Sequence, residues 1–331
     1  MAYEPPFSLN DRIVSAVANI AQKVGRIEGF EQLDRSPQLR KENRIKTIHS
    51  SLAIENNSLS IEQVTAVVEG RHVIAPPKDL LEVQNAIKAY EALFSFDPTS
   101  MDSLLTAHRV LMGGLVNGAG CFRSGNVGVF DGGELIHAGT PAAYVPEVMR
   151  DLFGWLRSTA VHPLIASCVF HYEFEFIHPF TDGNGRMGRL WQTLILSKWN
   201  PIFAWLPVES LVKENQEGYY AALGASDASG DSSEFLVFML SMIDAALDDV
   251  IQTQERSSAS AGASSGIKGE AAMVRARVLA LLKANPTMTM AQIGEELGIS
   301  RRQAERIAAS LKAEGLLVRV GANRNGHWEV P

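Results

Sequence analysis

The stretch "HPFTDGNGRMGR", His178–Arg189, places one histidine, one aspartate, three glycines and two arginines within twelve residues. Apolar residues with the spacing of one helix face begin inside it: Met187, Leu190, Trp191, Leu194 and Ile195. This spacing predicts a helix that starts near Arg186, with "DGNG" at its N-terminus. The unpaired backbone N–H groups and the positive dipole end of a helix N-terminus attract anions. The stretch therefore predicts a phosphate-binding loop.

The side chains of the loop favour a polyphosphate. Gly183 and Gly185 carry no side chain that would block the approach of a phosphate. Arg186 and Arg189 lie at i and i+3, on the face away from the apolar stripe, so both guanidinium groups reach the same place.

Asp182 and His178 are the candidate metal ligand and the candidate general base. A carboxylate beside phosphates needs a cation between them, and Mg²⁺ commonly takes one or two carboxylates plus substrate phosphates. Capping of the helix is the alternative role of Asp182. His178 follows the apolar helix expected over Pro163–Phe176, where a neutral imidazole could take a proton from a hydroxyl group; a structural role is the alternative.

Other phosphate and metal motifs are excluded by their spacing. The P-loop pattern GxxxxGK(S/T) and the HExxH pattern are absent, and "DGNGRM" lacks the glycine and the final glutamate of an EF-hand loop. The glycine-rich loop, HRD and DFG elements of protein kinases are also absent.

"HPFTDGNGRMGR" matches HPF-x-(D/E)-GNGR-x-x-R, the signature of the Fic family, at every fixed position. The resemblance extends over roughly Ser103 to Ala246, because "GCFRSGNVGVF" through "YVPEVM" is similar to the flap of that family and "LPVESLVKENQEGYYAAL" to its following helices. The resemblance implies a mainly α fold, a Fic-type helical bundle with a β-hairpin flap. It also implies a protein adenylyltransferase that moves AMP from ATP to a Ser, Thr or Tyr hydroxyl.

The same resemblance implies roles for the residues of the motif. His178 would deprotonate the target hydroxyl and Asp182 would hold Mg²⁺. The phosphates of ATP would be bound by the rest of the loop: Gly183, Asn184 and Gly185 at the α- and β-phosphates, Arg186 on the β side and Arg189 at the γ-phosphate. Tyr219 and Tyr220 match a tyrosine pair at the adenine site of relatives, although Asp227 stands where some relatives have Asn and both tyrosines could be core residues.

A second motif, "SLAIEN" at Ser51–Asn56, fits the family's inhibitory pattern (S/T)-x-x-x-E-(G/N). Ile45, Ile48 and Leu52 have helical spacing, so an inhibitory helix is expected over about residues 44–57. The resemblance implies that Ser51 and Glu55 belong to an element in which the glutamate pairs with Arg189. In some relatives this glutamate also supports removal of AMP from modified targets.

A β-hairpin is expected at about Val127–Ile136, because apolar residues flank the turn signal "DGG" and two prolines follow. A plain surface hairpin is the alternative. By the resemblance, the hairpin would dock a target protein as an added strand, mostly through backbone hydrogen bonds.

The C-terminal part of the chain has a different composition. "SSASAGASSGIKG" is typical of a flexible linker, and the segment after it resembles a winged helix-turn-helix, a small α+β domain, with Gly298 ending one helix and Ser300 capping the next. Gly266–Pro331 carries ten Lys/Arg and six Asp/Glu, a net charge of +4; since the whole chain is −7, the rest carries −11. Arg301, Arg302 and Arg306 would begin the recognition helix, so DNA is one candidate partner and a protein surface is the other.

The domains expected are an N-terminal helical region (1–102), a catalytic core (103–253), the linker (254–269) and the winged helix (270–331). The chain has 331 residues, of which 46% are hydrophobic and 20% charged, and no apolar run reaches the roughly 20 residues that span a bilayer. No signal peptide is visible, and Cys121 and Cys168 form no metal or disulfide pattern, so a cytosolic protein without a membrane partner is expected.

Two other functions stay open at this stage. One is a Fic-type phosphotransferase, although that branch of the family lacks the intact "GNGR" present here. The other is a transcription regulator that uses the winged helix and senses a nucleotide. Self-modification and a homodimer are further expectations from the resemblance.

Overall fold

The computed structural model describes residues 3–28, 37–131, 134–321 and 327–331. The chain divides into two compact units, Met1–Gln252 and Thr253–Pro331, and each unit is described by itself. The boundary expected after residue 253 lies close to this division, and the other domain boundaries expected from the sequence stay predictions.

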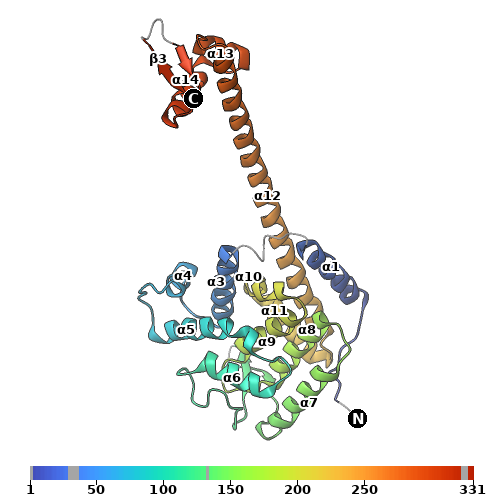
Figure 1. Ribbon diagram of the computed structural model, residues 1–331. Helices are drawn as coiled ribbons and strands as arrows, with labels where there is room; N and C mark the ends of the chain where they lie inside the picture. Colours follow the sequence, from blue (N-terminus) through green and yellow to red (C-terminus); the bar gives the residue numbers. More distant parts are fainter. Residues whose placement is uncertain (1–2, 29–36, 132–133, 322–326) are drawn as a thin grey trace. The chain divides into compact units, whose positions relative to one another are not determined.

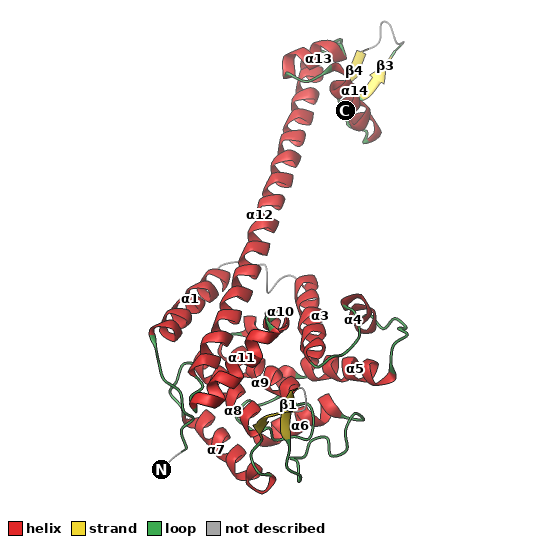
Figure 2. Cartoon of the chain, turned by 180° about the vertical axis from the view of Figure 1, so that it is seen from behind, coloured by secondary structure: helices red, strands yellow, loops and turns green. Residues whose placement is uncertain are grey.

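The first unit is built from helices, and its described strands form one hairpin (Figure 2). Its α-helices are α1 (Asp11–Glu28), α3 (Pro37–Ile54), α4 (Ile61–Val68), α5 (Pro77–Glu91), α6 (Met101–Met112), α7 (Val145–Ser158), α8 (Pro163–Ile177), α9 (Asn184–Trp199), α10 (Val208–Glu214), α11 (Gln216–Ser229) and the start of α12 (Ser233–Ala284). Short 3₁₀ helices are η1 (Leu93–Ser95), η2 (Ala142–Tyr144) and η3 (Pro201–Trp205). The prediction of a mainly α fold is confirmed.

Helices α8 and α9 pack side by side in the middle of this unit (Figure 1). Most side chains of both helices are buried, which explains why neither sequence has a long polar face. The loop between them carries the motif. His178 ends α8 with left-handed backbone angles (φ 52°), and Gly183 precedes α9 with φ 85°. The predicted phosphate loop is thus the short connection between two buried helices.

Helix α3 packs against α4, α5, α9 and α10. The helix expected over residues 44–57 ends earlier, at Ile54, and the following turn contains Asn56 at φ 64°. Glu55 therefore lies in this turn, just beyond the last helical residue. Its backbone N–H still donates to Leu52 O at 3.0 Å, so Glu55 stays on the helix end.

The expected hairpin is present in the backbone. Strands β1 (Gly128–Asp131) and β2 (Glu134–Ala138) pair antiparallel, with a register irregularity between Val129 and Phe130. Its turn, the glycine pair at 132–133, lies outside the described residues.

The second unit has the order of a winged helix, as predicted. Helix α13 (Met290–Leu297) ends at Gly298, and Ser300 begins α14 (Arg301–Ala313) in a capping box with Gln303. Strands β3 (Val318–Val320) and β4 (His327–Glu329) pair antiparallel. The loop predicted between them, "GANRNG", is described only at its first residue.

The prediction of a flexible linker over residues 254–269 is not matched by the structure, in which the 52-residue helix α12 runs through this segment. Alanine is the best helix former and serine costs little, so "SSASAGASSGIKG" does not forbid a helix despite its glycines. The segment also contains no proline, the residue that most strongly interrupts a helix.

Candidate active site

The motif loop is held by hydrogen bonds to its own backbone. The Asn184 side chain accepts from Phe180 N and donates to Phe180 O, each at 2.9 Å. His108 on α6 stacks on the Phe180 ring, with centroids 3.6 Å apart, and its Nε2 lies 3.0 Å from Asp182 O. Because Gly120 N–H donates to His108 Nδ1 at 2.8 Å, Nε2 carries the proton and donates to Asp182. The loop is fixed without any ligand.

The start of α9 leaves backbone N–H groups directed out of the helix end. In the described part of the chain, the first of them to meet a backbone acceptor is that of Met187, which donates to Gly183 O at 3.0 Å. A Cβ at Gly183 would lie 2.6 Å from Met112 Sδ, and a Cβ at Gly185 would lie 2.5 Å from Glu55 Oε1. The left-handed φ of 85° favours glycine at position 183, and the short distance at Gly185 shows that Glu55 reaches the helix end.

Arg189 is buried and is held by the end of α3. Its Nη2 donates to Glu55 Oε1 at 2.8 Å and to Ser51 O at 2.9 Å, and its Nε donates to Ser51 Oγ at 3.1 Å. The Arg189 side chain is 2% exposed, whereas that of Glu55 is 32% exposed. Burial opposes the charge of Arg189, but Glu55, then Tyr219 and Glu175, more than offset it, so the net pKa of Arg189 is raised.

Arg186 lies between two carboxylates. Its Nη1 is 3.1 Å from Glu82 Oε1 on α5, and its Nη2 is 3.0 Å from Asp182 Oδ1. The same Oδ1 accepts from Gly183 N at 2.6 Å. Asp182 therefore supports the turn before α9, which is close to the capping role considered as its alternative, yet its side chain stays 46% exposed.

His178 is half-buried at the end of α8. Its Nδ1 lies 3.3 Å from Glu175 O, an arrangement that leaves Nε2 as the proton acceptor when Nδ1 carries the hydrogen. Arg123 fixes the backbone around it: Nε donates to His178 O at 2.7 Å, and the other guanidinium nitrogens donate to Ile177 O, Gly125 O and Thr140 O. One side chain thus joins His178 to the segments on both sides of the hairpin.

Tyr219 and Tyr220 have different environments. Tyr219 is 2% exposed, and its hydroxyl lies 3.2 Å from His171 Nε2, so it belongs to the core and presents no face to a ligand. Tyr220 is 51% exposed and borders an open polar hollow with Lys213, Asn215 and others of α10 and α11. Tyr219 thus takes the core position considered as its alternative, and Tyr220 stays a predicted adenine contact. Asp227 accepts from Tyr172 Oη at 2.8 Å.

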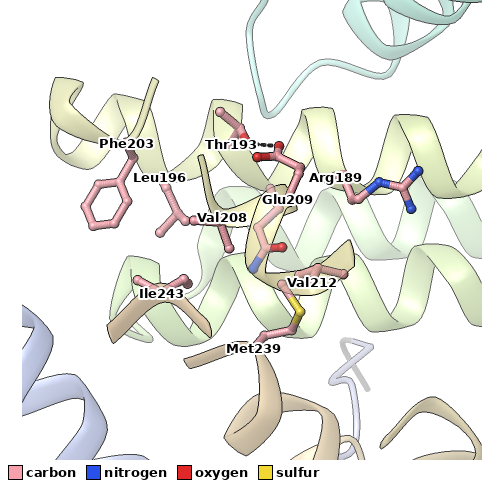
Figure 3. A pocket seen from close by; sticks show the side chains of 10 residues that line it. Arg189, Thr193, Leu196, Phe203, Val208, Glu209, Val212, Met239 and Ile243 are labelled. Carbon is pink, nitrogen blue, oxygen red and sulfur yellow. Dashed lines mark hydrogen bonds between the residues drawn. The ribbon is translucent and has the colours of Figure 1, made fainter. Parts of the chain in front are cut away.

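A small cavity of about 10 Å³ lies beside the stem of Arg189, between α9, α10 and α12 (Figure 3). Mainly apolar side chains line it. At its edge, Thr193 Oγ1 donates a hydrogen bond to Glu209 Oε1 at 3.3 Å. The Arg189 guanidinium points away from it in Figure 3. The cavity is too small for a nucleotide, so the candidate site is the loop at the start of α9.

Glu175 is a buried acid next to this loop. Its Oε1 has no hydrogen-bond partner among the described residues and lies 3.8 Å from Nε2 of His171. Burial raises the pKa of Glu175 to about 8. The charge of Arg189 lowers this pKa, and the charge of Glu55 raises it further. Burial also lowers the pKa of His171 to about 3, so this imidazole is neutral at neutral pH.

We expect Glu175→Gln to stabilise the protein at pH 8 but not at pH 5. The folded state holds the Glu175 proton up to about pH 8, while the unfolded chain releases it near 4.5. Stability is therefore lost as pH rises between these values, and the glutamine variant avoids this loss. Thermal unfolding of both proteins at pH 5 and 8 checks it; an equal difference at the two pH values would contradict the assignment.

Sequence reasoning missed three residues that shape the site, His108, Arg123 and Glu82. They lie outside the motif and reach it from α5, α6 and the segment before the hairpin. No spacing rule links them to the motif. Only the inclusion of Arg123 in "GCFRSGNVGVF", a segment already assigned to the flap, was a signal.

The chain matches two families. The Fic/DOC family matches residues 98–196, and the MarR family matches residues 266–326. A Fic family protein from Desulfovibrio desulfuricans, known from its crystal structure, is 39% identical with a TM-score of 0.75, over 99% of this chain and 98% of that chain. Protein adenylyltransferase fic-1 of Caenorhabditis elegans is 30% identical over 293 residues, 78% of this chain and 53% of the relative. A solved structure of Fic-1 from C. elegans is 25% identical with a TM-score of 0.59, over 74% of this chain and 75% of that one.

Fold and loop together define a helical protein with the HPF-x-(D/E)-GNGR-x-x-R loop between two central helices, joined to a winged-helix unit. The chain belongs to the Fic family, because a solved protein of that family is similar to it in sequence and fold over 99% of this chain. The chain spans about half the length of the curated relatives it matches, 46% to 53% of the first three. None of the described helices is both long enough and apolar enough to cross a membrane.

Proposed function

We propose that this chain is a protein adenylyltransferase that transfers AMP from ATP to a hydroxyl group of a protein. The observation that carries the proposal is that Asp182, Arg186 and Arg189 gather at the N-terminus of α9, in the short loop that begins with His178 at the end of α8. Phosphoryl-type transfer depends mainly on positioning and on stabilisation of charge, which these groups supply. The similarity to curated adenylyltransferases supports the same activity.

His178 acts as the general base in this proposal. The target oxygen attacks the α-phosphorus, pyrophosphate leaves with the electrons of the broken P–O bond, and the hydroxyl proton goes to Nε2 of His178. The contact from Nδ1 to Glu175 O and the grip of Arg123 on the His178 backbone keep the ring in one orientation. Arg186 and Arg189 neutralise the charge that develops on the leaving pyrophosphate.

Asp182 fits the ligand chemistry of Mg²⁺. Its two contacts in the described residues both use Oδ1, and the side chain is 46% exposed, so Oδ2 can reach a cation. Mg²⁺ held there by Asp182 would stabilise the negative charge of the phosphates. A single carboxylate suffices for such a site, and the described residues contain no cluster of three metal-ligating side chains.

The enzyme is autoinhibited in this proposal, because Glu55 occupies the guanidinium of Arg189. Glu55 Oε1 also lies 2.5 Å from the position that a Cβ of Gly185 would take, at the mouth of the proposed anion site. A γ-phosphate would compete for both positions. Removal of AMP from modified targets, with Glu55 as the supporting group, is an additional activity that this placement permits.

Each partner expected from the sequence remains a proposal. A target segment would pair with the hairpin. The end of the hairpin lies near His178, because a Cβ placed on Gly139 would be 3.4 Å from the Cβ of His178. Self-modification, a homodimer and the cytosolic location rest on the sequence alone. For the winged helix we propose DNA binding, supported by the exposed Arg302 and Arg306 on α14 and by the MarR family match.

Incubation with ATP labelled at the α- or the γ-phosphate tests the activity. The α-label should become bound to protein and the γ-label should leave as pyrophosphate. Protein that carries γ-label without α-label would replace the proposal by a phosphotransferase. Salt-sensitive binding to one DNA sequence without any labelled protein would favour a nucleotide-sensing regulator instead.

We expect Asp182→Ala to lower transfer by about 10- to 100-fold, the usual range for residues that support a metal site, and to abolish the response to added Mg²⁺. The alanine removes the carboxylate whose Oδ2 is proposed to bind the cation. Transfer is measured against Mg²⁺ concentration, with Asp151→Ala, an exposed change on α7, as the control. An unchanged Mg²⁺ response would assign the metal to other residues.

A further inference from the structure

The second buried ion pair of the site joins Arg186 to Glu82, which lies on α5 and far from the motif in sequence. The two side chains are 5% and 7% exposed, and Nη1 lies 3.1 Å from Oε1. A buried pair of charges gains little net stability, because desolvation opposes the attraction. Its placement against a motif arginine therefore calls for a role other than stability.

Glu82 is itself fixed from the turn after α3. Asn57 Nδ2 donates to Glu82 Oε2 at 2.8 Å and to Asp79 O at 3.1 Å. Each carboxylate oxygen of Glu82 thus has one partner, the arginine on one side and the amide on the other. Asn57 follows Glu55 by two residues, so the turn that presents the inhibitory glutamate also orients Glu82.

Without Glu82, the nearest acid for Arg186 is Asp182. Arg186 has two terminal nitrogens, and a guanidinium facing one carboxylate tends to bind it through two parallel hydrogen bonds. Glu82 takes Nη1, so Arg186 holds Asp182 through Nη2 alone. This division leaves Oδ2 of Asp182 outside the contact with Arg186, on a side chain that is 46% exposed.

We propose that Glu82 is a positioning residue that keeps Arg186 from closing on Asp182, and so preserves both the phosphate contact of Arg186 and the cation site of Asp182. The proposal rests on the proposed function of this loop in binding ATP and Mg²⁺. It also makes the turn at Asn57 a shared support: the N-terminal helices hold Arg189 through Glu55 and Arg186 through Glu82. A displacement of the whole turn would then free Arg189 at the expense of Arg186, so relief of inhibition requires movement of the Glu55 side chain alone.

Glu82→Gln tests the role, made in the Glu55→Gly protein so that ATP is not excluded. Glutamine keeps the size and the contact with Asn57 but loses the charge that holds Arg186. We expect the affinity for ATP to fall about tenfold, as for other groups that orient a binding residue, and the Mg²⁺ concentration for half-maximal ATP binding to rise. Calorimetry with ATP and with inorganic pyrophosphate measures both without any need for transfer. Glu91→Gln, an exposed change on the same helix, is the matched control and should leave both unchanged.

A double-mutant cycle with Arg186→Gln separates positioning from folding. If Glu82 acts through Arg186, Glu82→Gln should cause no further loss of affinity once Arg186 is replaced. An equal loss in both backgrounds, or ATP affinity and Mg²⁺ dependence equal to the parent, would overturn the proposal. If ATP and pyrophosphate bind as expected but no AMP is transferred, the proposed function fails while the role of Glu82 stands. If the parent binds neither, both fail.

Discussion

His178→Ala should lower AMP transfer by about 10²- to 10⁴-fold, the usual cost of removing a general base. ATP affinity should change little, because the proposed role of His178 is to take the proton of the target hydroxyl rather than to bind phosphates. The loss should therefore fall on the rate of the bound complex rather than on binding. Single-turnover transfer and calorimetric ATP affinity, both measured in the Glu55→Gly background, separate the two quantities.

His72→Ala is the matched control, since His72 is exposed in the first unit. Undiminished transfer by His178→Ala would remove His178 from the mechanism. A large loss of ATP affinity would instead indicate that the left-handed backbone at His178 shapes the loop. The two outcomes are distinct because ATP binding is measured directly.

The motif loop could be predicted from sequence because its information is local. Glycine spacing and the apolar stripe after it both lie within His178–Ile195, and the helix start differs by only two residues, at Asn184 instead of Arg186. The contact between Glu55 and Arg189 came from the family resemblance. Periodicity alone predicts the helix but does not predict which partner the Glu55 side chain contacts.

Glu82 and the core position of Tyr219 could not be predicted in this way. In the sequence, Glu82 has the same context as an ordinary solvated glutamate on an amphipathic helix. Its role appears only when α5 packs beside the turn at Asn57. Tyr219 and Tyr220 are neighbours in sequence, so only the orientation of α11 decides which of them is buried. Such properties depend on packing between elements far apart in the chain.

We expect Glu55→Gly to raise AMP transfer by about a hundredfold. Arg189 makes three described hydrogen bonds, of which two go to Ser51 and one to Glu55. A hydrogen bond between charged groups contributes about 1.5 to 3 kcal/mol, and about 1.4 kcal/mol corresponds to a tenfold change. Loss of the carboxylate thus opens the guanidinium to a γ-phosphate, while Ser51 keeps it in place.

Partial exposure of Glu55 decides how the effect should depend on conditions. Its side chain is 32% exposed, so salt screens the pair more than it would screen a fully buried one, and wild-type transfer should rise with ionic strength more than that of the variant. Asn56→Gly is the control for chain flexibility, because Asn56 already has φ 64° and glycine accepts this angle without strain. It should transfer AMP at the wild-type rate.

Transfer to the protein itself and to added targets is measured for wild type, Glu55→Gly, Glu55→Gln and Asn56→Gly. Glutamine keeps the length of the side chain but not its charge, so activation by Glu55→Gln as well would assign the inhibition to the charge that holds Arg189. If only the glycine variant were active, the bulk of the side chain next to Gly185 would be the obstacle, since Oε1 lies 2.5 Å from a notional Cβ there. Equal rates for all four proteins would leave the contact between Glu55 and Arg189 as a structural link between α3 and α9, without a part in inhibition.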